Sequence, residues 1–154
     1  MVPHLTPPSS EVVIDSADET VTTGLDCHKV PDAAVPTTWK CENVRVATNN
    51  TRPTDNPDLA LQRMVRSLSL FDEMPTAPIS TVDNLRLLVD DSLATVAMRR
   101  QVDGGQDFVV ITGGGEHAAS ISNQMWQALG GDSLPAEAIE TITDMDAPTQ
   151  ETEL

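Results

Sequence analysis

Residues 81–101, TVDNLRLLVDDSLATVAMRRQ, decide which fold class the sequence predicts. Their apolar side chains recur at intervals of three and four residues, which is the spacing of one helix face. These side chains are Val82, Leu85, Val89, Leu93 and Val96. Residues 85–89 also alternate in part, as a half-buried strand would. Because the helical pattern is the longer of the two, the sequence predicts one helix over residues 81–101.

Further helices are predicted on both sides of this segment. Asn56 can cap a helix that begins at Pro57 and carries apolar residues at helical spacing as far as Phe71. Residues 116–129 and 134–143 show two more helical patterns, the second capped by Ser133. Residues 108–112, FVVIT, form a short apolar run between turn signals, which predicts one buried strand. We therefore expect an α+β fold whose domain is small and mainly helical, with three to four helices and one strand.

The N-terminal third differs in composition from the rest of the chain. Residues 1–57 hold seven of the eleven prolines, and their apolar content is too low for a core of their own. Their β-prone runs are residues 11–15, 20–23 and 37–48. The imperfect alternation of the third run predicts a bulge near Asn43 or pairing against a partner. The sequence thus predicts three parts: an extended, β-prone interaction arm (1–57), a compact domain (58–143) and an acidic tail (144–154). Deleting residues 1–55 is expected to leave the domain folded.

The charge of the chain is strongly negative and unevenly distributed. Nine Lys and Arg face 24 Asp and Glu, and no basic residue follows Arg100. Such a surface repels phosphate backbones and anionic membranes, so neither nucleic acid nor membrane is an expected partner. The sequence contains no apolar run of 18 residues and no secretory signal pattern. A cytoplasmic or virion location is expected, in which Cys27 and Cys41 are more often free thiols than a bridge.

Residues 109–117, VVITGGGEH, are the sharpest candidate for chemistry. An apolar strand, a glycine turn and a helix start are the parts of a phosphate cradle. A dinucleotide fingerprint, however, needs a glycine where Ala118 stands, and Glu116 places a negative charge beside the phosphate position. The sequence therefore favours an ordinary turn at Gly113, Gly114 and Gly115.

The remaining candidates are weaker, and each has a structural alternative. Cys27, His28 and Cys41 could bind a metal with His4 or an acid, but their spacing fits no known finger. A thiol paired with His117 could act as a nucleophile, although acidic neighbours would raise its pKa.

Two pairs of charged residues and one asparagine are predicted to serve structure. Asp90 and Asp91 are neighbours on the predicted helix, so their carboxylates would not converge on one ion. Asn49 matches a glycosylation acceptor, which is silent without secretion. Arg99 and Arg100 would stabilise the end of the predicted helix, or would dock on the acidic tail of a neighbouring copy.

These features favour a non-enzymatic structural or accessory subunit of a large assembly, with a virion or capsid cement protein as the leading example. It would dock through residues 1–57 on protein subunits, including copies of itself, without a cofactor, a metal or catalytic residues. One alternative is an acidic inhibitor or adaptor that occupies a basic surface through residues 101–154. Another is a small nucleotide-binding enzyme that uses Gly113 to Gly115. An arm folded back on its own domain would favour a compact enzyme.

Overall fold

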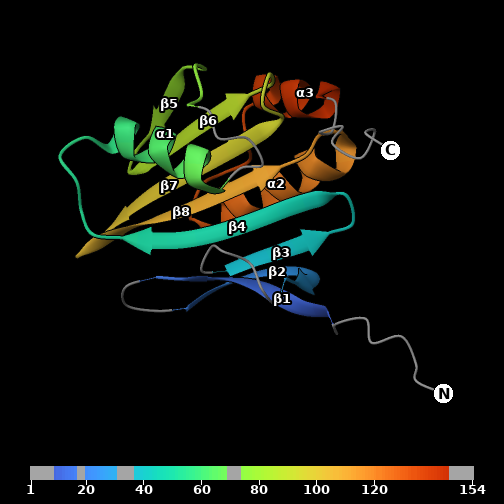
Figure 1. The fold of residues 1–154 in the computed structure, drawn as a ribbon, viewed down its shortest axis with the longest axis horizontal. Coiled ribbons are helices and arrows are strands. Elements are labelled where there is room, and N and C mark those ends of the chain that lie inside the picture. Colours follow the sequence, from blue (N-terminus) through green and yellow to red (C-terminus); the bar gives the residue numbers. More distant parts are fainter. Residues whose placement is uncertain (1–8, 17–19, 31–36, 69–73, 146–154) are drawn as a thin grey trace.

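The computed structural model describes residues 9–16, 20–30, 37–68 and 74–145. Its main feature is one antiparallel sheet of eight strands in the order β1-β2-β3-β4-β8-β7-β6-β5 (Figure 1). The strands are β1 (Ser9–Asp15), β2 (Thr20–Lys29), β3 (Thr37–Cys41), β4 (Val44–Thr51), β5 (Ile79–Val82), β6 (Leu85–Asp90), β7 (Thr95–Val102) and β8 (Gly105–Thr112). The sheet thus consists of two four-stranded meanders, β1–β4 and β5–β8.

The two meanders meet in the middle of the sheet. Strand β4 pairs with β8 from Arg45↔Thr112 to Thr51↔Gln106 without a break in register. This pairing joins the N-terminal strands to the C-terminal ones in a single sheet. Strands β1 and β5 are therefore its two edges.

Three helices cover the two faces of the sheet (Figure 1). Helix α1 (Pro57–Leu68) packs on one face, where Leu61 and Val65 are fully buried against Leu88, Phe108 and neighbouring apolar residues. Helices α2 (Glu116–Ala128) and α3 (Ala136–Asp144) lie on the other face, over the larger core. None of the helices in the described part of the chain is long and apolar enough to span a membrane.

The expected mainly helical domain is wrong, because residues 81–101 do not form one helix. They belong to β5, β6 and β7, which are separated by turns where Asp83 and Ala94 adopt positive φ angles of 54° and 48°. The alternative strand at residues 85–89 is the correct one. Helices cover this part of the sheet on both faces, so side chains on both sides of the strands are buried. Alternation therefore disappears, and the spacing of the remaining apolar residues imitates a helix.

The expected extended arm is also corrected. Residues 9–51, over their described part, form four strands of the sheet, and their side chains share one core with α2 and α3. The β-prone runs are confirmed as strands, but residues 37–48 are a hairpin with a turn at Glu42 (φ 59°) rather than a bulged strand. Residues 1–8, 31–36 and 146–154, with much of the predicted Pro-rich lead and acidic tail, lie outside the described residues.

The other predicted elements are confirmed with small shifts. Helix α1 begins at Pro57, and Asn56 caps it by accepting a hydrogen bond at Oδ1 from the Leu59 N–H (3.1 Å). Strand β8 and helix α2 occupy the predicted places. Helix α3 has Pro135 at its N-cap instead of Ser133. Phe71, the predicted end of the first helix, lies outside the described residues.

Candidate functional site

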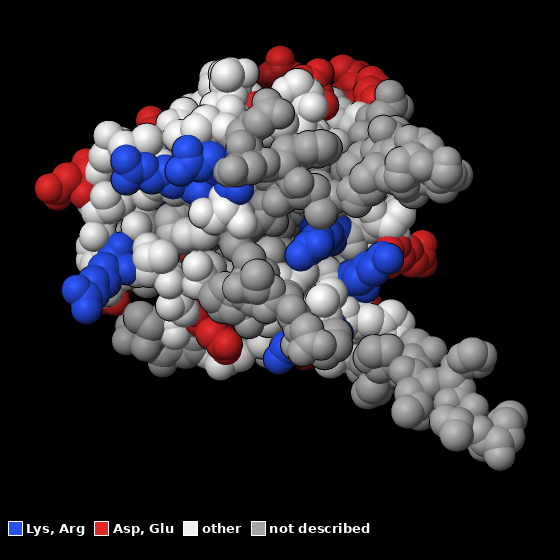
Figure 2. Space-filling view, in the orientation of Figure 1, with Lys and Arg blue, Asp and Glu red and all other residues white. Residues whose placement is uncertain are grey.

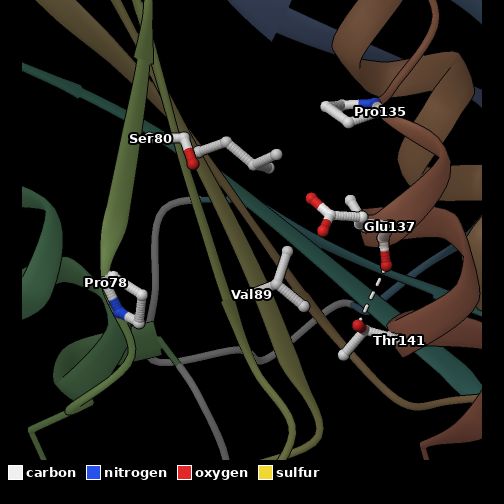
Figure 3. Close-up of a pocket in the computed structure, with 8 residues that line it drawn as sticks. Pro78, Ser80, Val89, Pro135, Glu137 and Thr141 are labelled. Carbon is white, nitrogen blue, oxygen red and sulfur yellow. Dashed lines mark hydrogen bonds between the residues drawn. The ribbon is translucent and has the colours of Figure 1, made fainter.

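A groove lies between the β5–β6 edge of the sheet and α3 (Figure 3). It has a volume of about 260 Å³. Its lining residues are Pro78, Ser80, Leu87, Val89, Pro135, Glu137, Ala138 and Thr141. They come from segments that are about fifty residues apart in the sequence, and the packing of α3 on the sheet brings them together.

The floor of the groove is apolar and one wall is acidic. Leu87 (4% exposed), Val89 and Ala138 provide the apolar surface. Glu137 lies in the first turn of α3, and its carboxylate points from the helix toward β5 and β6 (Figure 3). The Glu137 carbonyl accepts a hydrogen bond from the Thr141 hydroxyl (2.9 Å), which stays within the helix and leaves the carboxylate facing the groove.

The other wall of the groove is an unpaired sheet edge. Strand β5 pairs only with β6, through Val82↔Leu85, Ser80↔Leu87 and the residues between them. In a two-residue hairpin the residues next to the turn bond to each other, so Val82 and Ser80 bond inward. The backbone N–H and C=O groups of Thr81 and Ile79 therefore point outward. Val82, on the groove side of the strand, leaves 44% of its surface exposed.

Acidic side chains dominate the α2–α3 side of the molecule. Helix α3 carries Glu137, Glu140 and Asp144, and Glu116 begins α2. No Lys or Arg follows Arg100, so neither helix carries a Lys or an Arg. The groove therefore lies in a negative field on a chain whose net charge is −15.

The glycine loop is placed at the end of β8, as predicted, but two of its three amides donate to backbone carbonyls of the protein itself. The Gly113 N–H donates to Ala94 O (2.8 Å), and the Gly115 N–H donates to Ile142 O (3.1 Å). A Cβ on Gly114 would lie 2.3 Å from the Met145 carbonyl oxygen. The glycines thus allow α3 to pack closely on the loop, which is a structural reason for their presence.

Cys27 and Cys41 form a disulfide, so the expectation of free thiols is wrong. The pairs His28↔Lys40 and Lys29↔Trp39 set the register in which the two cysteines face each other across β2 and β3, with Cα atoms 4.8 Å apart. The sequence could not show this register. Both sulfurs are unavailable to a metal or as nucleophiles while the bond is intact.

The structure does bring some of the predicted metal and nucleophile residues together. His28 and His117 line a hollow of about 180 Å³ beside the disulfide, along with Lys40 and two acidic residues. No group of three potential metal ligands occurs within the described ranges. His4 lies outside them.

Asp90 and Asp91 do not converge on a common site. Asp90 is 3% exposed and accepts hydrogen bonds that hold the β6–β7 turn, whereas Asp91 is exposed. Asn49 lies in β4 beneath α1, where its side chain contacts the Met64 sulfur (3.8 Å). Asp90 therefore stabilises the β6–β7 turn, and Asn49 contributes to the packing of α1 on the sheet.

Arg99 and Arg100 lie in β7 rather than at the end of a helix, and their side chains point to opposite faces. Arg100 forms an ion pair with buried Asp107 (2.8 Å) on the α2–α3 face. Arg99 is 3% exposed on the α1 face, and its Nε donates to the Gln106 side chain.

Sequence reasoning missed the groove because it missed β5. The available signal was Asp83-Asn84, a turn dipeptide between the short apolar runs ISTV and LRLLV. No family model matches the chain, and neither a curated protein nor a solved structure gives a match.

Proposed function

We propose that this chain is a non-enzymatic binding domain that holds an extended, basic segment of a partner protein at β5 and α3. The groove beside an unpaired strand edge is the observation that carries the proposal. An extended segment can add a ninth strand through the outward backbone groups of Thr81 and Ile79. Its alternate side chains would then face the groove.

The chemistry of the groove selects the kind of segment. Leu87, Val89 and exposed Val82 offer apolar contact area. Glu137 offers a carboxylate that a Lys or Arg side chain of the partner can reach. The negative charge of the whole chain attracts a basic partner and repels an acidic one.

This proposal joins two of the functions that the sequence suggested, an assembly component and an acidic adaptor. Docking through an N-terminal arm is no longer supported, because residues 9–51, over their described part, belong to the chain's own sheet. A folded-back arm would favour a compact enzyme, but the amides of Gly113 and Gly115 already bind backbone carbonyls. The glycine loop therefore does not support a nucleotide-binding site.

The disulfide supports a location different from the cytoplasm. Disulfides persist in oxidising compartments and on virion or cell surfaces, and they are rare where glutathione keeps thiols reduced. We infer that the chain works in such an oxidising setting. Thiol labelling of the native protein, with and without prior reduction, would report the state of Cys27 and Cys41 there.

Peptide binding tests the proposed function. We expect a fluorescent eight-residue peptide of alternating Val and Lys to bind, with its affinity falling as salt rises, and a Val–Glu peptide not to bind. Glu137→Lys should weaken binding at least tenfold. Glu116→Lys changes the net charge equally but lies away from the groove, so this variant should bind nearly as the wild type does.

A second pair of variants tests the strand edge. Thr81→Pro removes an outward N–H, whereas Thr81→Val keeps it and loses only the hydroxyl, which accepts a hydrogen bond from Arg86. Binding lost in Thr81→Pro and retained in Thr81→Val supports strand addition. Equal binding by all four variants, or equal binding of both peptides, would contradict the proposal.

A further inference from the structure

Arg99 is a buried cation that has no carboxylate partner among the residues that the structure describes. It is 3% exposed, and its only hydrogen bond within the described residues runs from Nε to the Gln106 side-chain oxygen. Gln106 is itself held by the Thr51 hydroxyl (3.0 Å) and the Arg52 carbonyl (2.9 Å). A buried guanidinium loses its hydration and needs an opposite charge to compensate.

A second cation lies directly opposite Arg99. Arg86 and Arg99 are register partners on β6 and β7, so both side chains project from the α1 face. Like charges in this arrangement repel each other. Burial, the larger cause, lowers the pKa of Arg99, and the charge of Arg86 lowers it further, against an opposing effect of Asp58. Figure 2 shows Lys and Arg side chains spread over this face of the molecule.

One carboxylate only partly balances the two arginines. Asp58, in the first turn of α1, accepts a hydrogen bond from Arg86 Nη1 (2.8 Å), but no ion pair joins Asp58 to Arg99. The three groups therefore leave one positive charge in excess. The Arg86 side chain is 25% exposed, so Arg86 reaches the surface beside the N-terminus of α1, and Arg99 lies buried directly behind it.

We propose that Arg99 and Arg86 bind a carboxylate at the N-terminal end of α1. A guanidinium presents a planar fork that matches a carboxylate in a bidentate geometry. The single excess positive charge fits a monoanion better than a doubly charged phosphate. The carboxylate can belong to a small organic acid or to an acidic side chain of a partner, and both sources offer the same chemistry.

Titration of the full chain with acetate tests this site. The ¹H–¹⁵N signals of the Arg99 and Arg86 Nε groups should shift in a saturable way with acetate and not with chloride at equal ionic strength. A hexapeptide with a single Glu, capped at both termini, tests the second source. Binding of acetate alone identifies a small acid, and tighter binding of the peptide identifies a partner's side chain.

Matched variants separate a site from general salt effects. Arg99→Met should raise the acetate dissociation constant at least tenfold, while Arg63→Met removes an exposed arginine of α1 and should leave it unchanged. If Arg99→Met does not fold, Arg86→Met gives the same comparison. Nε signals that do not move with acetate, or that move equally with chloride, would overturn the proposal.

Discussion

At the scale of single residues, Asp90 shows how one buried carboxylate holds two segments. Its Oδ1 accepts hydrogen bonds from the Ser92 N–H, the Ser92 hydroxyl (2.6 Å) and the Leu93 N–H, and Oδ2 accepts one from the Thr76 N–H (3.1 Å). Asp90→Ala should therefore lower the free energy of unfolding by about 2–4 kcal/mol, measured by urea denaturation. Asp91→Ala, next to it and exposed, should change it by less than about 0.5 kcal/mol.

The pH dependence of stability gives an independent test of the same residue. Burial acts to raise the pKa of Asp90, but hydrogen bonds from Ser92, Thr76, Leu93 and Ala77 outweigh it, and the pKa lies below its usual 3.8. A lowered pKa means that the carboxylate contributes its full stability above the unfolded value. That contribution is lost as the pH falls through the folded value. Asp90→Asn should lack this acid-induced loss, and an identical pH profile would contradict the assignment.

At the scale of elements, the disulfide fastens the β1–β2 hairpin to the sheet. Over the described residues, β2 and β3 are joined by two residue pairs and by one further hydrogen bond from the Val30 N–H to Thr38 O (2.8 Å), so the ladder alone holds the hairpin weakly. The bond closes a loop of about 15 residues, for which the chain-entropy model gives about 3 kcal/mol. Reduction should lower stability by this amount and accelerate hydrogen exchange first in β1 and β2.

A double variant, Cys27→Ser with Cys41→Ser, provides the control. It should match the reduced wild type in stability and should not respond to reductant. Unchanged stability on reduction, or exchange that accelerates evenly over the whole sheet, would show that the hairpin does not depend on the bond.

The elements also show which patterns in a sequence are informative. The capped helix α1 and the glycine-terminated helix α2 each bury one face, so their period is visible in the sequence. Strands β6 and β7 are buried on both faces, so no alternation marks them. The groove could not be predicted, because it depends on where α3 packs against a strand pair that precedes it by about fifty residues.

At the scale of the whole molecule, composition suggested three parts where the described structure has one sheet. The sequence predicts that the Pro-rich third has too few apolar residues for a core of its own. The prediction of a separate arm is wrong, because Trp39, Val44 and Val46 belong to the core that α2 and α3 also share. A segment with few apolar residues can pack against another part of its own chain or against another protein. Residue composition does not distinguish these two cases.

Truncation tests this central claim most directly. A chain of residues 56–154 would leave the β8 edge unpaired and would remove Trp39 from the core around Trp126. We predict that circular dichroism of this fragment shows no cooperative thermal transition, whereas the full chain melts cooperatively. A fragment that melts cooperatively near the temperature of the full chain would contradict the single-sheet account and would restore an independent C-terminal domain.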